Sequence, residues 1–174
     1  MNDGVELNEL GGLGGLSGLS GDRVLLRPTT DGDTEILHRV VREPEVAAWW
    51  SPPPDSYRDK LAIVFEGEVV GAIQFSEEND PQFRRAGIDI FLTTRLRGRG
   101  LGTDAVRTLA RWLVGERGHH RLTIDPAAAN TSAIRCYGKV GFKPVGIMRA
   151  YWHNERTGAW EDGLLMDLLA DELI

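Results

Sequence analysis

Residues 97–103 read Arg97-Gly98-Arg99-Gly100-Leu101-Gly102-Thr103, a glycine-rich turn between two strongly patterned segments. Ala86 to Leu92 before it has the apolar character of a strand, and Thr103 to Glu116 after it has apolar residues at helical spacing. Glycines let the backbone curl closely around a ligand, and the free N–H groups at a helix start attract an anion. Arg97 and Arg99 add charge suited to phosphate. The turn therefore predicts a pyrophosphate site, although a plain strand-to-helix turn has the same composition.

Two common phosphate-binding patterns are excluded at this turn. No Gly-Lys-Ser/Thr follows it, as a Walker loop requires, and it lacks the Gly-x-Gly-x-x-Gly spacing of dinucleotide-binding proteins.

The segments around the turn predict one α/β domain from residue 22 to residue 174, built on a mixed sheet. The predicted strands are 24–28, 60–66, 69–75, 86–92, 121–124, 142–148 and 163–169, and the predicted helices are 36–41, 45–50, 103–116 and 131–140. Residues 1–21 are predicted to form a separate Gly/Leu-rich leader. It is expected either to lie outside the fold or to dock its leucines on a partner or a neighbouring subunit.

Composition narrows the class of protein. A chain of 174 residues can bury a core without disulfides or a structural metal, and its single cysteine excludes a Cys-rich zinc site. The formal net charge of −6 argues against nucleic acid and favours a cationic partner. No apolar run approaches the roughly 20 residues that span a bilayer, and the acidic N-terminus does not resemble a signal peptide. We therefore expect a cytoplasmic protein that binds neither metal nor membrane.

A second informative stretch, NTSAIRCYGKVGF, runs from Asn130 to Phe142. Together with the turn it resembles the GNAT superfamily of acetyl-CoA-dependent N-acetyltransferases. In that family an Arg/Gln-x-x-Gly-x-Gly/Ala turn holds the CoA pyrophosphate, and a later helix carries an Asn near its start and a Tyr before Gly-Phe. The matching residues here are Arg97, Gly100 and Gly102, then Asn130, Tyr137, Gly141 and Phe142. The resemblance extends from about Val24 to Leu169.

The resemblance implies a mixed, mostly antiparallel central sheet with a splayed pair of parallel strands, flanked by helices. Acetyl-CoA would lie in the V between strands 88–92 and 122–125. The implied cofactor contacts are Phe91, Leu92, Arg97, Gly98, Arg99, Gly100, Leu101, Gly102, Thr103, Asn130 and Ala133. A backbone N–H near Phe91 or Leu92 would stabilise the oxyanion.

Tyr137 would donate a proton to the leaving thiolate, because a phenol with a pKa of about 10 stays protonated at neutral pH. The alternatives are that Tyr137 only packs helix against sheet and that Asn130 is only a helix cap.

Carboxylates supply the candidate acceptor site. Asp89 lies between two isoleucines in a strand, where an acid needs a partner or a function, and Asp125 ends another strand just before Pro126. Such carboxylates facing one cleft would bind a polycation and accept protons from its amines.

A narrower resemblance is to the aminoglycoside 6'-N-acetyltransferases. It rests on Trp49-Trp50 after Glu45, Gly87-Ile88-Asp89, Gly100 to Thr103, Asp125-Pro126 and Ala133 to Tyr137. In that group the two acids bind the drug's amino groups, and one of them, or a water it holds, is the base. The resemblance thus assigns catalysis to Tyr137, Asp89 and Asp125, and substrate binding to Trp49, Trp50, Asp89, Asp125 and Asp162. The spacing at Asp162 matches less cleanly, and the tryptophans could instead be core residues.

Three functions follow from these expectations. The first is transfer of acetyl from acetyl-CoA to an aminoglycoside amine, which would confer resistance, by a monomer or homodimer. The second is a GNAT that acetylates a protein N-terminus, a lysine or another small amine, and the third is a non-catalytic CoA-binding module.

Other polar residues are expected to be structural. His119 and His120 are predicted to be exposed at a helix end, Glu77 to lie in a solvated loop, and Cys136 to be a buried thiol. Trp152, His153 and Trp160 flank a turn that forms either a lid or the end of a hairpin.

Overall fold

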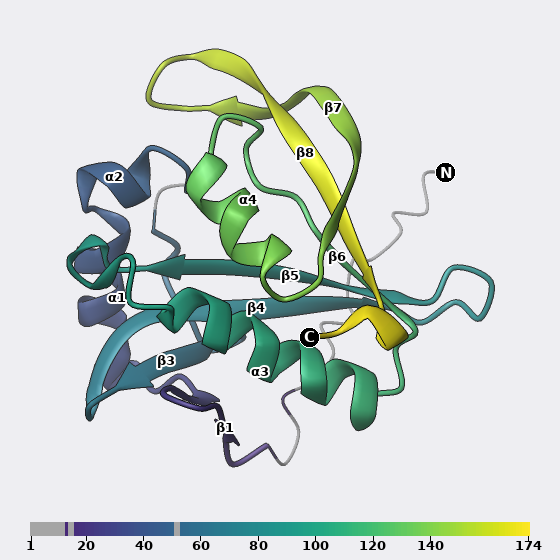
Figure 1. Cartoon of the computed structure of the whole chain (residues 1–174). Coiled ribbons are helices and arrows are strands. Elements are labelled where there is room, and N and C mark those ends of the chain that lie inside the picture. Colours follow the sequence, from purple (N-terminus) through teal and green to yellow (C-terminus); the bar gives the residue numbers. More distant parts are fainter. Residues whose placement is uncertain (1–12, 14–15, 51–52) are drawn as a thin grey trace, which may run out of the picture.

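A computed structural model describes residues 13, 16–50 and 53–174, which are arranged around a twisted sheet (Figure 1). Its eight strands have the order β1-β2-β3-β4-β5-β6-β8-β7. They are β1 (Leu19–Ser20), β2 (Leu25–Pro28), β3 (Leu61–Phe65), β4 (Glu68–Glu78), β5 (Arg85–Leu92), β6 (Arg121–Ile124), β7 (Lys143–Asn154) and β8 (Ala159–Leu169). The α-helices are α1 (Thr34–Val41), α2 (Pro44–Ala47), α3 (Leu101–Gly115) and α4 (Thr131–Gly138).

The β5–β6 pair is parallel, and the other paired strands of the described sheet are antiparallel. β5 and β6 pair only at Ala86↔Leu122 and Gly87↔Thr123, after which they separate. The expected mixed, mostly antiparallel sheet with a splayed parallel pair is therefore confirmed. Asp89 and Asp125 both follow the last paired positions, so each lies where the strands diverge.

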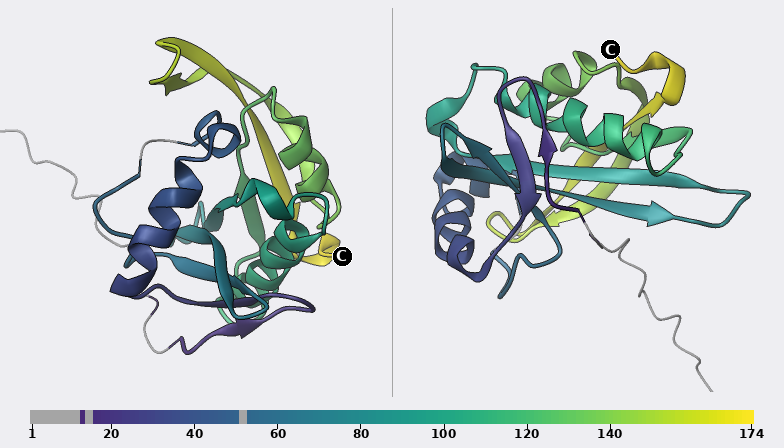
Figure 2. Two further views of the ribbon diagram at one scale, coloured as in Figure 1. Left: turned by 90° about the vertical axis from the view of Figure 1, so that its left-hand side faces the viewer. Right: turned by 90° about the horizontal axis from the view of Figure 1, so that it is seen from below.

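Helices lie on both faces of the sheet (Figure 2). Each face carries its own core, because successive residues of a strand point to opposite sides. Ile73 of β4 packs with α3 in the larger core, whereas its neighbour Ala72 packs with α1 in the smaller one. Among the described residues, no helix is both long and apolar enough to cross a bilayer.

The Gly/Leu-rich segment is part of the fold where the structure describes it. Leu19 pairs with Leu26 of β2, and Leu13 and Leu16 pack against the larger core. The domain therefore begins before residue 22, and these leucines contact the chain's own core. The remaining residues of the expected leader, 1–12 and 14–15, lie outside the described residues.

A buried carboxylate in α3 holds the end of this segment. Asp104 is only 5% exposed and accepts the backbone N–H groups of Asp22 (3.0 Å), Arg23 (2.8 Å) and Val24 (2.9 Å). Three donors on one side chain fix the chain between β1 and β2 against the helix.

Replacing Asp104 with Ala should lower the free energy of unfolding by about 3 kcal/mol, because partly buried N–H groups lose their acceptor. Urea denaturation monitored by circular dichroism measures this loss. Asp104→Asn, which keeps one carbonyl oxygen, should lose less, and the exposed Asp22→Ala is the control. An unchanged midpoint for Asp104→Ala would remove this role.

The expectations for His119 and Glu77 are wrong. Glu77 belongs to β4, and its side chain is 1% exposed; it accepts from Arg117 Nη2 at 2.6 Å and lies 2.7 Å from Nε2 of the fully buried His119. The hydrogen bond from Arg117 holds the pKa of Glu77 below its ordinary value. His120 is exposed, as expected. The cluster joins the end of β4 to the loop after α3.

Candidate active site

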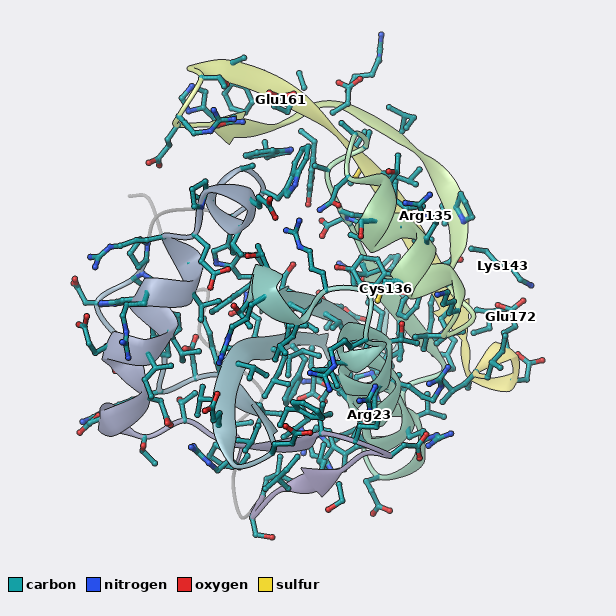
Figure 3. All side chains as sticks on the ribbon, turned by 60° about the vertical axis from the view of Figure 1, so that its left-hand side comes forward. Arg23, Arg135, Cys136, Lys143, Glu161 and Glu172 are labelled. Carbon is teal, nitrogen blue, oxygen red and sulfur yellow. The ribbon has the colours of Figure 1, made fainter. Side chains whose placement is uncertain are left out.

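A cavity of about 970 Å³ occupies the gap where β5 and β6 diverge. Its walls come from both strands, the turn at 97–103, α4, the end of α2 and the β7–β8 hairpin. Figure 3 shows Arg135 and Cys136 on α4, above the start of α3 in that view, and both residues line the cavity.

The glycine-rich turn has the geometry of an anion cradle. Gly98 and Gly100 adopt positive φ angles of 74° and 80°, which side chains other than glycine rarely adopt. Gly100 is the N-cap of α3 and supplies no side chain to cap the first N–H groups of the helix, which begins at Leu101 rather than at Thr103. The cavity wall includes Gly98, Gly100, Leu101, Gly102 and Thr103.

The two arginines of the turn have different surroundings. Arg97 lines the cavity, and its guanidinium bonds the Glu45 carboxylate at 2.9 Å and the Glu45 carbonyl at 3.2 Å. Arg99 stacks 5.0 Å over the ring of Phe65 and is not part of the cavity wall. The structure therefore does not place Arg99 at the expected cofactor site, because its guanidinium lies over an aromatic ring of β3.

Sequence reasoning missed two cations of the wall, Arg135 and Lys139. They are four residues apart at the end of α4, a spacing that places both on one helix side. That spacing was available as a signal in the sequence.

Tyr137 lines this site while remaining 7% exposed. Its ring packs edge-on against Phe142, with 6.4 Å between centroids. Burial raises the pKa of Tyr137 well above its ordinary value, and the nearby Cys136, Asp89 and Asp125 add to the effect. The phenol therefore keeps its proton at neutral pH. Burial also raises the pKa of the half-buried Cys136 thiol, which lies 3.3 Å from Thr103 Oγ1.

Asp89 and Asp125 both line the cavity at the point where β5 and β6 diverge. Gln74, directly opposite Asp89 on β4, donates to Asp89 Oδ2 at 3.1 Å. Asp89 lines the cavity and is exposed, yet enough protein surrounds it that desolvation raises its pKa, and the charge of Asp125 adds to this effect. Both acids also line a second, polar cavity of about 340 Å³ that includes Glu78.

The aromatic residues Trp49 and Trp50 line the main cavity. Trp49 is 38% exposed, while the ring of Trp50 packs 5.0 Å from that of Phe91. Phe91 and Leu92 of β5 line the cavity as well. Gly71 allows β4 to approach this part of β5, since a Cβ there would lie 2.2 Å from the Phe91 carbonyl oxygen.

Two side chains that were expected to contact the cofactor or the substrate instead form hydrogen bonds with the protein backbone. Asn130 lines the cavity beside Ala133, but its side chain accepts the Ala133 N–H at 3.2 Å and so caps α4. Asp162 does not line the main cavity; its Oδ1 accepts the N–H of Ala150 at 2.8 Å.

A residue that the sequence did not single out is Tyr151, whose hydroxyl donates to Asp125 Oδ2. Tyr151 and Trp152 belong to the β7–β8 hairpin and line the cavity. The hairpin alternative for this segment is thus the one observed, and His153 pairs with Trp160 across it.

The arrangement can be compared with known proteins. Residues 30–142 match the Acetyltransferase (GNAT) family. Aminoglycoside N(6')-acetyltransferase type 1 of Klebsiella pneumoniae is 31% identical to this chain, with 73% of this chain and 77% of the relative covered.

Solved structures share the fold. Mycobacterium smegmatis RimJ in complex with CoA-disulfide has a TM-score of 0.78 at 21% identity, with 90% of this chain and 88% of that chain covered. AAC(6')-Ib in complex with ribostamycin and coenzyme A has a TM-score of 0.69 at 24% identity, with 87% and 96% covered. Since the family match spans more than half of the sequence and the curated relative exceeds 30% identity, the chain belongs to the GNAT acetyltransferase family.

Proposed function

We propose that this protein transfers the acetyl group of acetyl-CoA to an amine of an aminoglycoside, the 6'-amine by similarity to the Klebsiella pneumoniae enzyme, and so confers resistance. The observation that carries the acceptor class is the pair Asp89 and Asp125 at the divergence of β5 and β6, beside exposed Trp49. Two carboxylates favour a substrate with several ammonium groups, and an aromatic wall favours sugar rings.

The residues present fit coenzyme A at one end of the cavity. Gly98 and Gly100 leave open space where a Cβ would stand, and the uncapped start of α3 suits a pyrophosphate. Arg97, Arg135 and Lys139 add positive charge on the same wall. When bound there, acetyl-CoA supplies the activated acyl group.

Asp89 is the group best suited to take a proton from the acceptor ammonium, because its raised pKa lies closer to neutrality than that of an ordinary carboxylate. Asp125 already accepts a hydrogen bond from Tyr151 and would bind the same or a neighbouring ammonium. As the carbon–nitrogen bond forms, a backbone N–H of β5 near Phe91 or Leu92 would donate to the carbonyl oxygen. Tyr137 would protonate the departing sulfur as the carbon–sulfur bond breaks.

A thiol-release assay over aminoglycosides, polyamines and N-terminal peptides tests this proposal. Aminoglycosides carrying a 6'-amine should release coenzyme A with the highest kcat/KM, and mass spectrometry of the product should show one added acetyl group. Higher kcat/KM for peptides or polyamines would overturn the acceptor assignment. No thiol release with any amine, despite coenzyme A binding, would favour the non-catalytic module.

The two arginines of the turn provide a test variant and its matched control for the cofactor end of the cavity. Arg97→Ala should raise the dissociation constant of coenzyme A about tenfold, because a charge-assisted contact to phosphate is lost. Arg99→Ala should leave it near the wild-type value, since its guanidinium lies over Phe65. Isothermal titration calorimetry measures both constants, and equal losses would show that Arg99 reaches the ligand.

A further inference from the structure

An irregular segment of β7 lies directly beside the two carboxylates. Pairing with β8 is regular at Met148↔Gly163 and resumes at Trp152↔Glu161, so three residues of β7 oppose Asp162 alone. Within this bulge Ala150 has a φ of 49°, which is uncommon for a residue with a Cβ. In Figure 3 the labelled Glu161 marks the place on β8 where pairing resumes.

Several contacts hold the bulge in this form. Asp162 Oδ1 accepts the Ala150 N–H at 2.8 Å, while the Asp162 carbonyl accepts the N–H of Ala128 at 2.8 Å. Gly163 lies under the ring of Tyr151, since a Cβ there would be 2.7 Å from Tyr151 Cδ1. The same β8 residues thus position the bulge and the loop that follows Asp125.

The result is that the Tyr151 hydroxyl reaches Asp125. It donates to Oδ2, and no other described side chain donates to this carboxylate. This hydrogen bond, with burial, raises the pKa of Tyr151 to about 12, so the phenol keeps its proton at neutral pH. Tyr151 lines both cavities, at the border where Asp89 and Asp125 are also shared.

We infer that the bulge is a positioning device for the acceptor: anchored by Asp162, it sets Tyr151 to hold one oxygen of Asp125 so that the other faces the substrate ammonium. Tyr151 and Asp162 are thus positioning residues, and Asp162 acts through a backbone N–H rather than by contacting the substrate as expected. The inference rests on the proposed function for its substrate, but the Tyr151–Asp125 pair is testable without one.

Kinetics separate positioning from direct contact. Tyr151→Phe should raise the aminoglycoside KM about tenfold while the acetyl-CoA KM stays within twofold, because only the orientation of Asp125 is lost. Asp162→Ala should act in the same direction, and the double variant should be no worse than Tyr151→Phe alone, since both changes act on one unit. Additive losses, or a rise in both KM values, would overturn the inference.

The matched variant is Asp162→Asn, whose amide oxygen can still accept the Ala150 N–H although the charge is gone. It should recover most of the loss seen in Asp162→Ala. Adding Ala150→Gly to Asp162→Ala should also recover part of it, because glycine takes the positive φ without strain. An Asp162→Asn variant as impaired as Asp162→Ala would assign the charge itself to substrate binding and contradict the proposed role.

Ultraviolet titration of the free protein gives a readout that needs no acceptor. Asp125→Asn and Asp162→Ala should each make one additional tyrosine ionise near its ordinary pKa of about 10, and Tyr151→Phe should abolish that signal in both backgrounds. An unchanged titration in Asp125→Asn would refute the pair. The expected titration in a protein that acetylates no aminoglycoside would refute the substrate while supporting the pair.

Discussion

Replacing Tyr137 with Phe is expected to lower kcat by a hundredfold or more, which is the usual contribution of a positioned general acid. Tyr137 lines the cavity at the point where β5 and β6 diverge, and its raised pKa keeps the phenol protonated until the thiolate departs. The ring itself packs on Phe142, so phenylalanine preserves the contact between α4 and the sheet. The dissociation constant of acetyl-CoA should therefore change little.

Steady-state kinetics with saturating aminoglycoside, together with calorimetric binding of coenzyme A, measure this split. Tyr57→Phe is the matched control, because Tyr57 is also buried but belongs to the smaller core, and its hydroxyl has no described hydrogen-bond partner. That control should retain wild-type kcat. A Tyr137→Phe variant with unchanged kcat would mean that the thiolate leaves unassisted or is protonated by another group.

Local signals explain which parts of the site could be predicted from the sequence. The turn at Gly98 to Gly102 depends on glycine conformation. The strand that carries Asp89 and the strand that ends just before Asp125 depend on apolar spacing, and both signals act over a few neighbouring residues. The splay of β5 and β6 was expected from the family resemblance, and the structure shows two paired positions followed by divergence.

The errors arose where distant residues decide a side chain's surroundings. Arg99 belongs to the glycine-rich turn, but its guanidinium lies over the ring of Phe65 of β3. His119 follows a helix end, a position typical of exposed residues, yet Glu77 from 42 positions earlier buries it. Tyr151 carried no signal, because its direction depends on a bulge that shifts the strand alternation.

Asp89→Asn is expected to have opposite effects on activity and stability. For activity, kcat/KM for the aminoglycoside should fall about a hundredfold when the base is removed. Wild-type kcat/KM should decline on acidification through the raised pKa of Asp89, and the variant should lack that limb of the profile.

Stability follows from the same shift in the pKa of Asp89. Because burial raises the folded-state pKa of Asp89 above its unfolded value, the folded protein binds this proton more tightly. The contribution of this tighter proton binding to stability is present below the unfolded pKa of about 4 and is lost as pH rises through the folded pKa. At neutral pH the ionised carboxylate therefore costs stability that an amide does not, so Asp89→Asn should raise Tm there and gain little at pH 4.

Thermal unfolding across this range measures the difference, and Gln74→Ala is the comparison, because it removes the one described side-chain donor to Asp89 without removing the charge. A lower Tm for Asp89→Asn at neutral pH would show that the carboxylate stabilises the sheet. Asp89 would then be a structural residue rather than the general base that takes a proton from the acceptor ammonium.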